Sequence, residues 1–198
     1  MLMNVIETRM KTKLIHRTFS VALLGVLIAI PSNFPAAANP GPAPQPNIGV
    51  NGYYANDKAQ RGRTVQAAIV MDIPGGYHVN ANRPLGKYAI PTALKIDVPR
   101  GVTVGTVSYP RAIVRKLKAG NNEPLAVYEG RAVLRFNINV PASYKGNEVV
   151  LKARLRYQSC NDEVCFPPKN QEVDMGIGVV GPGDPVKRAN GWIFGGRR

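Results

Sequence analysis

Residues 132–158 read AVLRFNINVPASYKGNEVVLKARLRYQ, and this stretch decides the fold class. Apolar and polar side chains alternate with a period of two on both sides of the Lys145-Gly146-Asn147 turn, which predicts two strands that each bury one face. The same alternation recurs elsewhere, at residues 65–73, 94–98 and 173–179 and more weakly at 102–109. Turn-forming residues separate these runs. We therefore expect an all-β domain, an immunoglobulin-like β-sandwich of about seven strands.

The composition limits the chemistry that the protein can perform. The chain has 198 residues, of which 44% are hydrophobic and 19% charged, enough for one domain with a packed core. Its two cysteines and two histidines are too few for a four-ligand zinc site, and they also argue against haem or iron–sulfur clusters. We expect neither a metal nor a cofactor.

The first 38 residues have the layout of a secretory signal peptide. Basic residues precede the uncharged run at residues 19–30, and Ala36-Ala37-Ala38 supplies the small residues of a cleavage site. The uncharged run is shorter than the roughly 20 residues that a membrane-spanning helix needs. We expect cleavage after Ala38 and an exported mature chain without a transmembrane span; the alternative is an uncleaved amino-terminal anchor.

The rest of the chain divides into three parts. We expect a Pro-rich linker and lead-in segment at residues 39–63, the β-domain at 64–180 and a flexible basic tail at 181–198. The net charge of the whole chain is +14. In an exported protein this charge suits an anionic envelope polymer or an acidic protein rather than nucleic acid, or is simply a cationic soluble surface. We expect a monomer.

Residues 156–169, RYQSCNDEVCFPPK, carry the candidate chemistry. Asn161 and Asp162 favour a turn, so the chain can reverse and bring the sulfurs of Cys160 and Cys165 together. A disulfide is the default state of a cysteine pair in an oxidising compartment. It would be either a structural staple or a redox pair, since a short-range bridge in a polar turn is more exposed and more reducible than a buried one.

Sequence motifs around this pair resemble the amino-terminal domain of the thiol:disulfide interchange protein DsbD. They are Tyr157-Gln158-x-Cys160 with Cys165-Phe166-Pro167-Pro168, and upstream residues 76–82 (GYHVNAN), 90–94 (IPTAL), 101–105 (GVTVG) and 127–130 (VYEG). The resemblance implies an immunoglobulin-like periplasmic domain whose redox pair is Cys160 and Cys165. It also implies electrons received from a thioredoxin-like partner and passed to exported disulfide-containing proteins, including isomerases, reductases and cytochrome c maturation factors.

The resemblance also directs attention to the surroundings of the pair. Members of the family shield the cysteines with a cap loop; the equivalent stretch at residues 110–125 is basic and lacks an aromatic residue, which leaves Leu117 or Leu125 as the shield. By analogy we expect Cys160 to attack first. The residues expected to line the site are Tyr157, Asp162, Glu163, Tyr128 and His78, although packing is an alternative role for the tyrosines and a structural role for His78.

Three functions follow from these observations. The first is a thiol–disulfide oxidoreductase domain that exchanges electrons through the cysteine pair. The second is an exported immunoglobulin-like binding module with a structural disulfide. The third, a hydrolase, is disfavoured because a Ser–His–Asp site would have to be built around His78, the lone histidine of the mature chain.

Overall fold

The computed structural model describes residues 44–195. The predicted signal peptide at residues 1–38 lies outside this described part. Strands are the main regular structure of the described chain, and its helical elements are a 3₁₀ turn, η1 (Lys118–Gly120), and one short helix, α1 (Gly191–Phe194). The predicted all-β fold class is therefore confirmed. Within residues 44–195, no helix has the length and apolar character required to cross a membrane.

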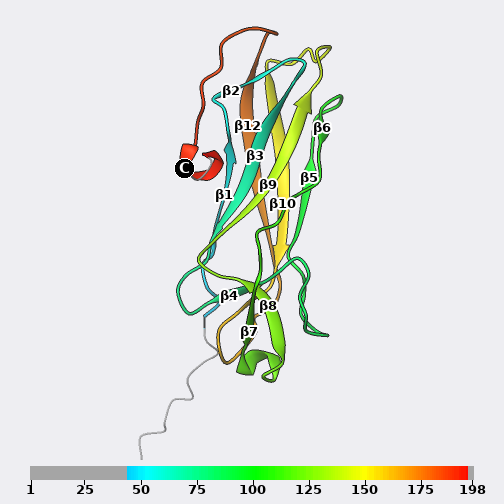
Figure 1. The fold of residues 1–198 in the computed structure, drawn as a ribbon. Coiled ribbons are helices and arrows are strands. Elements are labelled where there is room, and N and C mark those ends of the chain that lie inside the picture. The colour runs from blue at the N-terminus through cyan, green and yellow to red at the C-terminus, as the bar shows by residue number, and fades with distance from the viewer. Residues whose placement is uncertain (1–43, 196–198) are drawn as a thin grey trace, which may run out of the picture. The chain divides into compact units, whose positions relative to one another are not determined.

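Two four-stranded sheets form the sandwich. One has the order β1 (Gly49–Tyr54), β3 (Arg63–Asp72), β9 (Arg131–Val140) and β6 (Thr103–Val104). The other has the order β2 (Lys58–Gln60), β12 (Lys169–Val180), β10 (Glu148–Tyr157) and β5 (Ala93–Asp97). Figure 1 shows the long strands β3 and β9 of the first sheet beside β10 and β12 of the second.

The strands form where the period of two predicts them, because one face of each strand enters a common core. In β9 the even-numbered residues are buried, and in β10 the odd-numbered ones are; the alternate residues are exposed apart from Val133, which is half-buried. Residues from both sheets join one apolar cluster, whose most enclosed members include Ile69, Met71, Leu134, Ile138, Leu151 and Leu155. Burial of this apolar surface is the main stabilising contribution to the sandwich.

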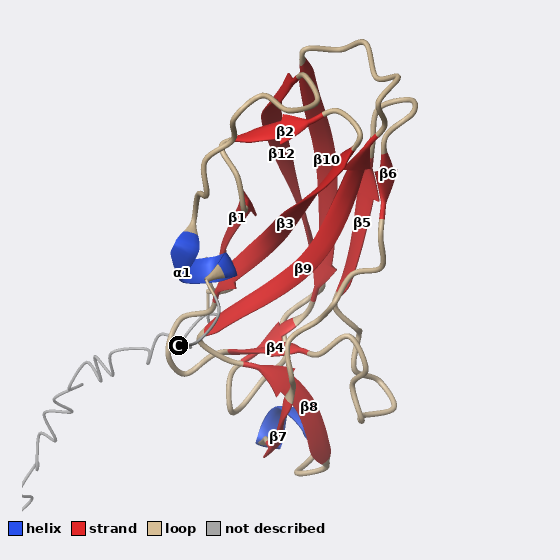
Figure 2. Ribbon diagram, turned by 45° about the horizontal axis from the view of Figure 1, so that its top comes forward, coloured by secondary structure: helices blue, strands red, loops and turns tan. Residues whose placement is uncertain are grey.

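A third, smaller sheet lies at one end of the sandwich (Figure 2). Its order is β11 (Ser159–Cys160), β4 (His78–Asn80), β8 (Pro124–Tyr128) and β7 (Ile113–Lys116), with all neighbours antiparallel. β11 follows directly from the long strand β10, so the small sheet continues the sandwich at the point where the first cysteine lies.

The segment before residue 64 differs from the predicted linker. Residues 49–54 and 58–60 are strands β1 and β2, and Ile48, Val50 and Ala59 belong to the main core. β1 pairs with β3 over its whole length. This pairing forms the strand although apolar and polar residues do not alternate strongly in β1. The β-domain therefore begins near residue 48, and β1 and β2 precede its predicted start at residue 64.

The segment after residue 180 also differs from the predicted flexible tail as far as residue 195. Helix α1 buries Ile193 against Ala68 and Val70 on the outer face of β3. Trp192 packs edge-on against Tyr53 with ring centroids 5.2 Å apart. Covering the outer face of β3 explains why Ala68 and Val70, predicted to face water, are fully buried.

Candidate functional site: a disulfide at the end of the sandwich

Cys160 and Cys165 form a disulfide that joins two directly opposed residues of an antiparallel bridge. The flanking backbone bonds run from Asn161 N–H to Val164 O (2.9 Å) and from Phe166 N–H to Ser159 O (2.8 Å). This is the non-hydrogen-bonded type of pair, in which opposed Cα atoms approach most closely. The Cα atoms of the two cysteines are accordingly 3.9 Å apart.

The turn between the cysteines is held by its own side chains and by Gln158. The Asn161 Oδ1 accepts hydrogen bonds from the backbone N–H groups of Glu163 (2.9 Å) and Val164 (2.7 Å), which confirms Asn161 as a turn former. Gln158 donates from Nε2 to Phe166 O (3.1 Å), on the far side of the second cysteine. Six residues are thus fixed at both ends by bonds that do not involve sulfur.

The two cysteines differ sharply in exposure. Cys160 has no exposed surface, whereas Cys165 is exposed. The difference arises because Cys160 is part of β11 and pairs with His78 in β4, while Cys165 follows the turn, on the outer side of the loop. A molecule approaching from solvent therefore meets Cys165.

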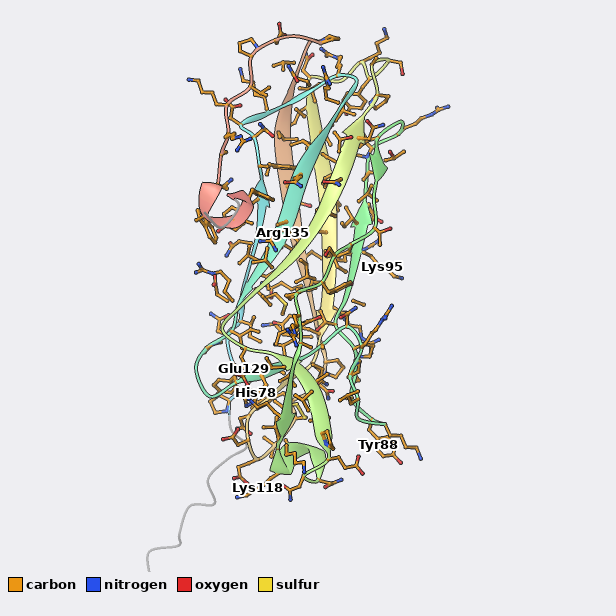
Figure 3. The ribbon with its side chains drawn as sticks, viewed as in Figure 1. His78, Tyr88, Lys95, Lys118, Glu129 and Arg135 are labelled. Atoms are coloured by element: carbon orange, nitrogen blue, oxygen red, sulfur yellow. A yellow bond between two sulfur atoms is a disulfide. The ribbon has the colours of Figure 1, made fainter. Side chains whose placement is uncertain are left out.

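Cys165 also lines a pocket of about 220 Å³. One wall comes from the loop at residues 86–89, including the exposed side chain of Tyr88, and the other from residues 119–125 of the β7–β8 hairpin. Figure 3 shows Tyr88 and Lys118 on separate loops at this end of the molecule. The pocket is thus a hollow beside the exposed residue Cys165.

The hairpin of β7, η1 and β8 occupies the predicted cap region at residues 110–125. Its Leu117 and Leu125 are buried in a separate cluster with Val127, and Leu125 lines the pocket beside Cys165. Backbone atoms of the hairpin contact residues 160–165, the cysteine loop. Ala119 N–H donates to Asp162 O (3.0 Å), and Ala119 O lies 4.0 Å from the Cys165 Sγ. The cysteine loop is thus covered on this side by Ala119, a residue that the sequence did not single out.

A chain of charged side chains runs from the hairpin to the cysteine loop. Arg115 in β7 donates to both carboxylate oxygens of Glu129 (2.7 and 2.9 Å). The Glu129 Oε1 also lies 2.8 Å from His78 Nδ1, and the His78 Nε2 lies 3.1 Å from Asp162 Oδ1. A separate pair joins Lys118 Nζ to Glu163 (2.9 Å). Figure 3 shows His78 next to Glu129, above the hairpin.

These contacts shift the pKa values of Glu129, Arg115 and Lys118. The hydrogen bond from Arg115, helped by the one from His78, lowers the pKa of Glu129 below its ordinary value. The same contact raises the pKa of Arg115, and the hydrogen bond to Glu163 raises the pKa of Lys118. Glu129 is therefore a carboxylate at neutral pH, and each basic partner stays charged.

The structure divides the predicted lining residues into two groups. Asp162 and Glu163 lie in the cysteine loop itself, and His78 contacts Asp162. Tyr157 and Tyr128 belong to the main apolar core; the Tyr157 hydroxyl contacts Gln171 Oε1 (3.3 Å), and the Tyr128 hydroxyl donates to Asn82 Oδ1 (2.7 Å). Burial raises the pKa of both phenols. Both tyrosines occupy packing positions, the alternative role that the sequence left open.

Gln158, Glu129 and Arg115 also belong to the site, although they are not among the residues that the sequence predicts to line it. Gln158 accepts hydrogen bonds from Asn80 Nδ2 (2.9 Å) and Ile90 N–H (3.1 Å), so it ties the cysteine loop to two neighbouring segments. Its place in the Tyr157-Gln158-x-Cys160 motif was the available signal. Arg115 and Glu129 lie 14 residues apart and meet because β7 and β8 pair, which no local pattern indicates.

Among residues 44–195, no three side chains of the metal-binding types gather closely enough to hold a metal ion. The described part of the chain is an immunoglobulin-like β-sandwich that carries at one end a disulfide with one buried and one exposed cysteine.

The chain matches a protein family over residues 51–176, which is more than half of its length. It belongs to the family described as "Thiol:disulfide interchange protein DsbD, N-terminal". The match includes both cysteines and the strands from β1 to most of β12.

Solved structures with a similar fold include the reduced DsbD N-terminal domain of Neisseria meningitidis. It is 19% identical, with a TM-score of 0.40, and the match covers 65% of this chain and 88% of that one. The N-terminal periplasmic domain of ScsB from Proteus mirabilis is 12% identical, with a TM-score of 0.43, and the match covers 63% of this chain and 44% of that one. Among curated protein sequences, none matches this chain.

Proposed function

We propose that this protein is a periplasmic thiol–disulfide exchange domain. It accepts electrons from a thioredoxin-like partner through Cys160 and Cys165 and passes them to exported proteins that contain disulfides. Membership of the DsbD N-terminal family supports this role. The observation that carries the proposal is the unequal burial of the pair, one sulfur-bearing residue fully enclosed and the other exposed beside a pocket.

This unequal burial assigns different roles to the two cysteines. A thiolate must reach a disulfide sulfur to attack it, and the exposed residue is Cys165. We therefore assign the mixed disulfide to Cys165 and the leaving sulfur to Cys160, the reverse of the order that we expected by analogy.

The exchange balances as two successive displacements. A partner thiolate bonds to the Cys165 Sγ, the bond between the two sulfurs breaks, and its electron pair passes to the Cys160 Sγ. The second thiol of the partner then attacks the mixed disulfide as a thiolate and releases Cys165. The partner becomes a disulfide and the Cys160–Cys165 pair becomes a dithiol, which reduces the next protein by the same steps in reverse.

Reduction of the cysteine pair leaves the surrounding loop in place in this scheme. The bonds from Asn161, Gln158 and the flanking backbone do not involve sulfur. The domain can therefore cycle between oxidised and reduced forms with little rearrangement, as an electron carrier must.

The deciding experiment is the reduction potential of the pair in the purified mature protein. Equilibration with glutathione or dithiothreitol buffers, followed by alkylation and mass measurement, gives the potential. We expect about −180 to −270 mV, the range of exchange proteins. A value below about −300 mV would indicate a structural bridge and favour the binding-module alternative.

Trapping tests the assignment of roles. The Cys160→Ala variant, with its remaining thiol activated as an aromatic mixed disulfide, should form a covalent complex with a thioredoxin-like protein that lacks its own second cysteine. The matched Cys165→Ala variant should form far less of this complex, because its thiol is buried. Equal trapping through both cysteines would contradict the assigned order.

A further inference from the structure

His78 lies directly opposite Cys160 in the small sheet. The register of β4 and β11 pairs His78 with Cys160 and Val79 with Ser159. Side chains of directly opposed residues leave the same face of a sheet, with Cβ atoms about 4.5–5.5 Å apart. The imidazole and the Cys160 side chain therefore project from the same face of the small sheet.

The imidazole of His78 lies between two carboxylates. Its Nδ1 lies 2.8 Å from a Glu129 oxygen and its Nε2 lies 3.1 Å from an Asp162 oxygen. Ionised carboxylates only accept hydrogen bonds, so both contacts are hydrogen bonds only when both ring nitrogens carry a proton. The ring is thus placed to carry a proton on each nitrogen, with a carboxylate oxygen facing each one.

The carboxylates around His78 differ in their other partners and in their exposure. Glu129 is shared with Arg115, and Glu163 is paired with Lys118, which leaves Asp162 as the main counter-charge. The side chain of Asp162 is 74% exposed, whereas that of His78 is 10% exposed. Water and salt screen a charge on the exposed carboxylate more than a charge on the buried ring.

We propose that His78, as an imidazolium held between the carboxylates of Glu129 and Asp162, stabilises the thiolate that forms on Cys160 when a partner thiol attacks Cys165. This inference rests on the proposed function, because it concerns the first displacement. The electron pair of the broken bond goes to the Cys160 Sγ, at a position with no exposed surface and hence little hydration. A buried anion is disfavoured unless a cation lies nearby, and an adjacent imidazolium favours the thiolate form. No proton has to move in this step.

A purely mechanical role makes a different prediction. If the contact between His78 and Asp162 only clamps the cysteine loop, removing either side chain loosens the loop in the same way. If charge is what matters, removing the cation and removing the carboxylate act in opposite directions on ionisation of the thiol. The sign of the two effects therefore separates the two roles.

The test uses the Cys165→Ser background, in which Cys160 is the remaining thiol, since the chain has two cysteines. Ultraviolet thiolate absorbance is followed against pH. We expect His78→Gln to lower the acid dissociation constant of Cys160 about tenfold. Asp162→Asn should raise it, and His78→Lys should recover part of the loss. Tyr54→Phe, which removes a buried hydrogen bond to Met175 O, is the matched control and should leave it unchanged.

Circular dichroism verifies that each variant is folded. Asp162 is exposed, so Asp162→Asn is expected to fold and still tests the sign if His78→Gln does not. Shifts in the same direction from both variants, or no shift from Asp162→Asn, would overturn the proposal. The titration needs no partner protein, so it is independent of the proposed function. A reduction potential below about −300 mV would refute the exchange function. Opposite shifts of the Cys160 acid dissociation constant in the two variants would still support the effect of His78 on that thiol.

Discussion

The disulfide should stabilise the domain only modestly, and the double variant Cys160→Ala/Cys165→Ala tests this. The bridge closes a loop of six residues, for which the chain-entropy relation gives about 2 kcal/mol at 25 °C. The non-sulfur bonds of the loop remain in the variant, and the core of the sandwich lies elsewhere. We expect the free energy of unfolding to fall by about 2–3 kcal/mol.

The assay is urea unfolding followed by circular dichroism and by intrinsic fluorescence. The dependence on urea concentration should have nearly the same slope in the oxidised wild type and the variant, with only the midpoint lowered. The reduced wild type is the control, and it should unfold near the midpoint of the double variant. A loss above about 5 kcal/mol, or a variant that does not fold, would show that the bridge is a structural staple. It would also refute the idea of a reduced domain that carries electrons.

Three further predictions concern separate parts of the molecule. Ile193→Ala should lower the free energy of unfolding by about 2 kcal/mol and speed amide exchange in β3, because it uncovers Ala68 and Val70; unchanged exchange would mean that α1 does not cover β3. The pKa of Glu129 is depressed on folding, so its stabilising contribution is full above its ordinary value of 4.5 and is lost as pH falls through the folded pKa; the stability difference between wild type and Glu129→Gln should therefore shrink below pH 4.5, and a constant difference would contradict this. In the reduced protein, iodoacetamide should modify Cys165 faster than Cys160, as measured by peptide mass spectrometry, and the opposite order would contradict the assigned roles.

The fold class and the cysteine pair were predictable from the sequence because both depend on local information. Strands β9 and β10 alternate strictly, and a strand with one buried face needs little more than that pattern. The turn between the cysteines is also local, since Asn161 bonds to backbone groups two and three residues later. The family motifs lie in the same short segments.

Tertiary structure decided which faces are covered. The alternating pattern of β3 predicts that Ala68 and Val70 face water, but α1, more than 120 residues later in the chain, packs over them. Similarly, β1 is a strand because it pairs with β3, although its own sequence resembled a linker. A distant segment that covers or pairs with a strand leaves no periodic pattern in that strand's own sequence. Local patterns therefore could not predict that Ala68 and Val70 are covered or that β1 is a strand.

The charged surroundings of the disulfide also arise only from the fold. Pairing of β4 with β11 brings His78 beside Cys160, and pairing of β7 with β8 brings Arg115 to Glu129. The sequence by itself determined an all-β chain with a short-range cysteine pair. The tertiary structure decided that one cysteine is buried opposite His78 and the other is exposed. The physical reason is that burial and charge at a sulfur depend on strands that are distant in sequence, whereas a period of two and a tight turn do not.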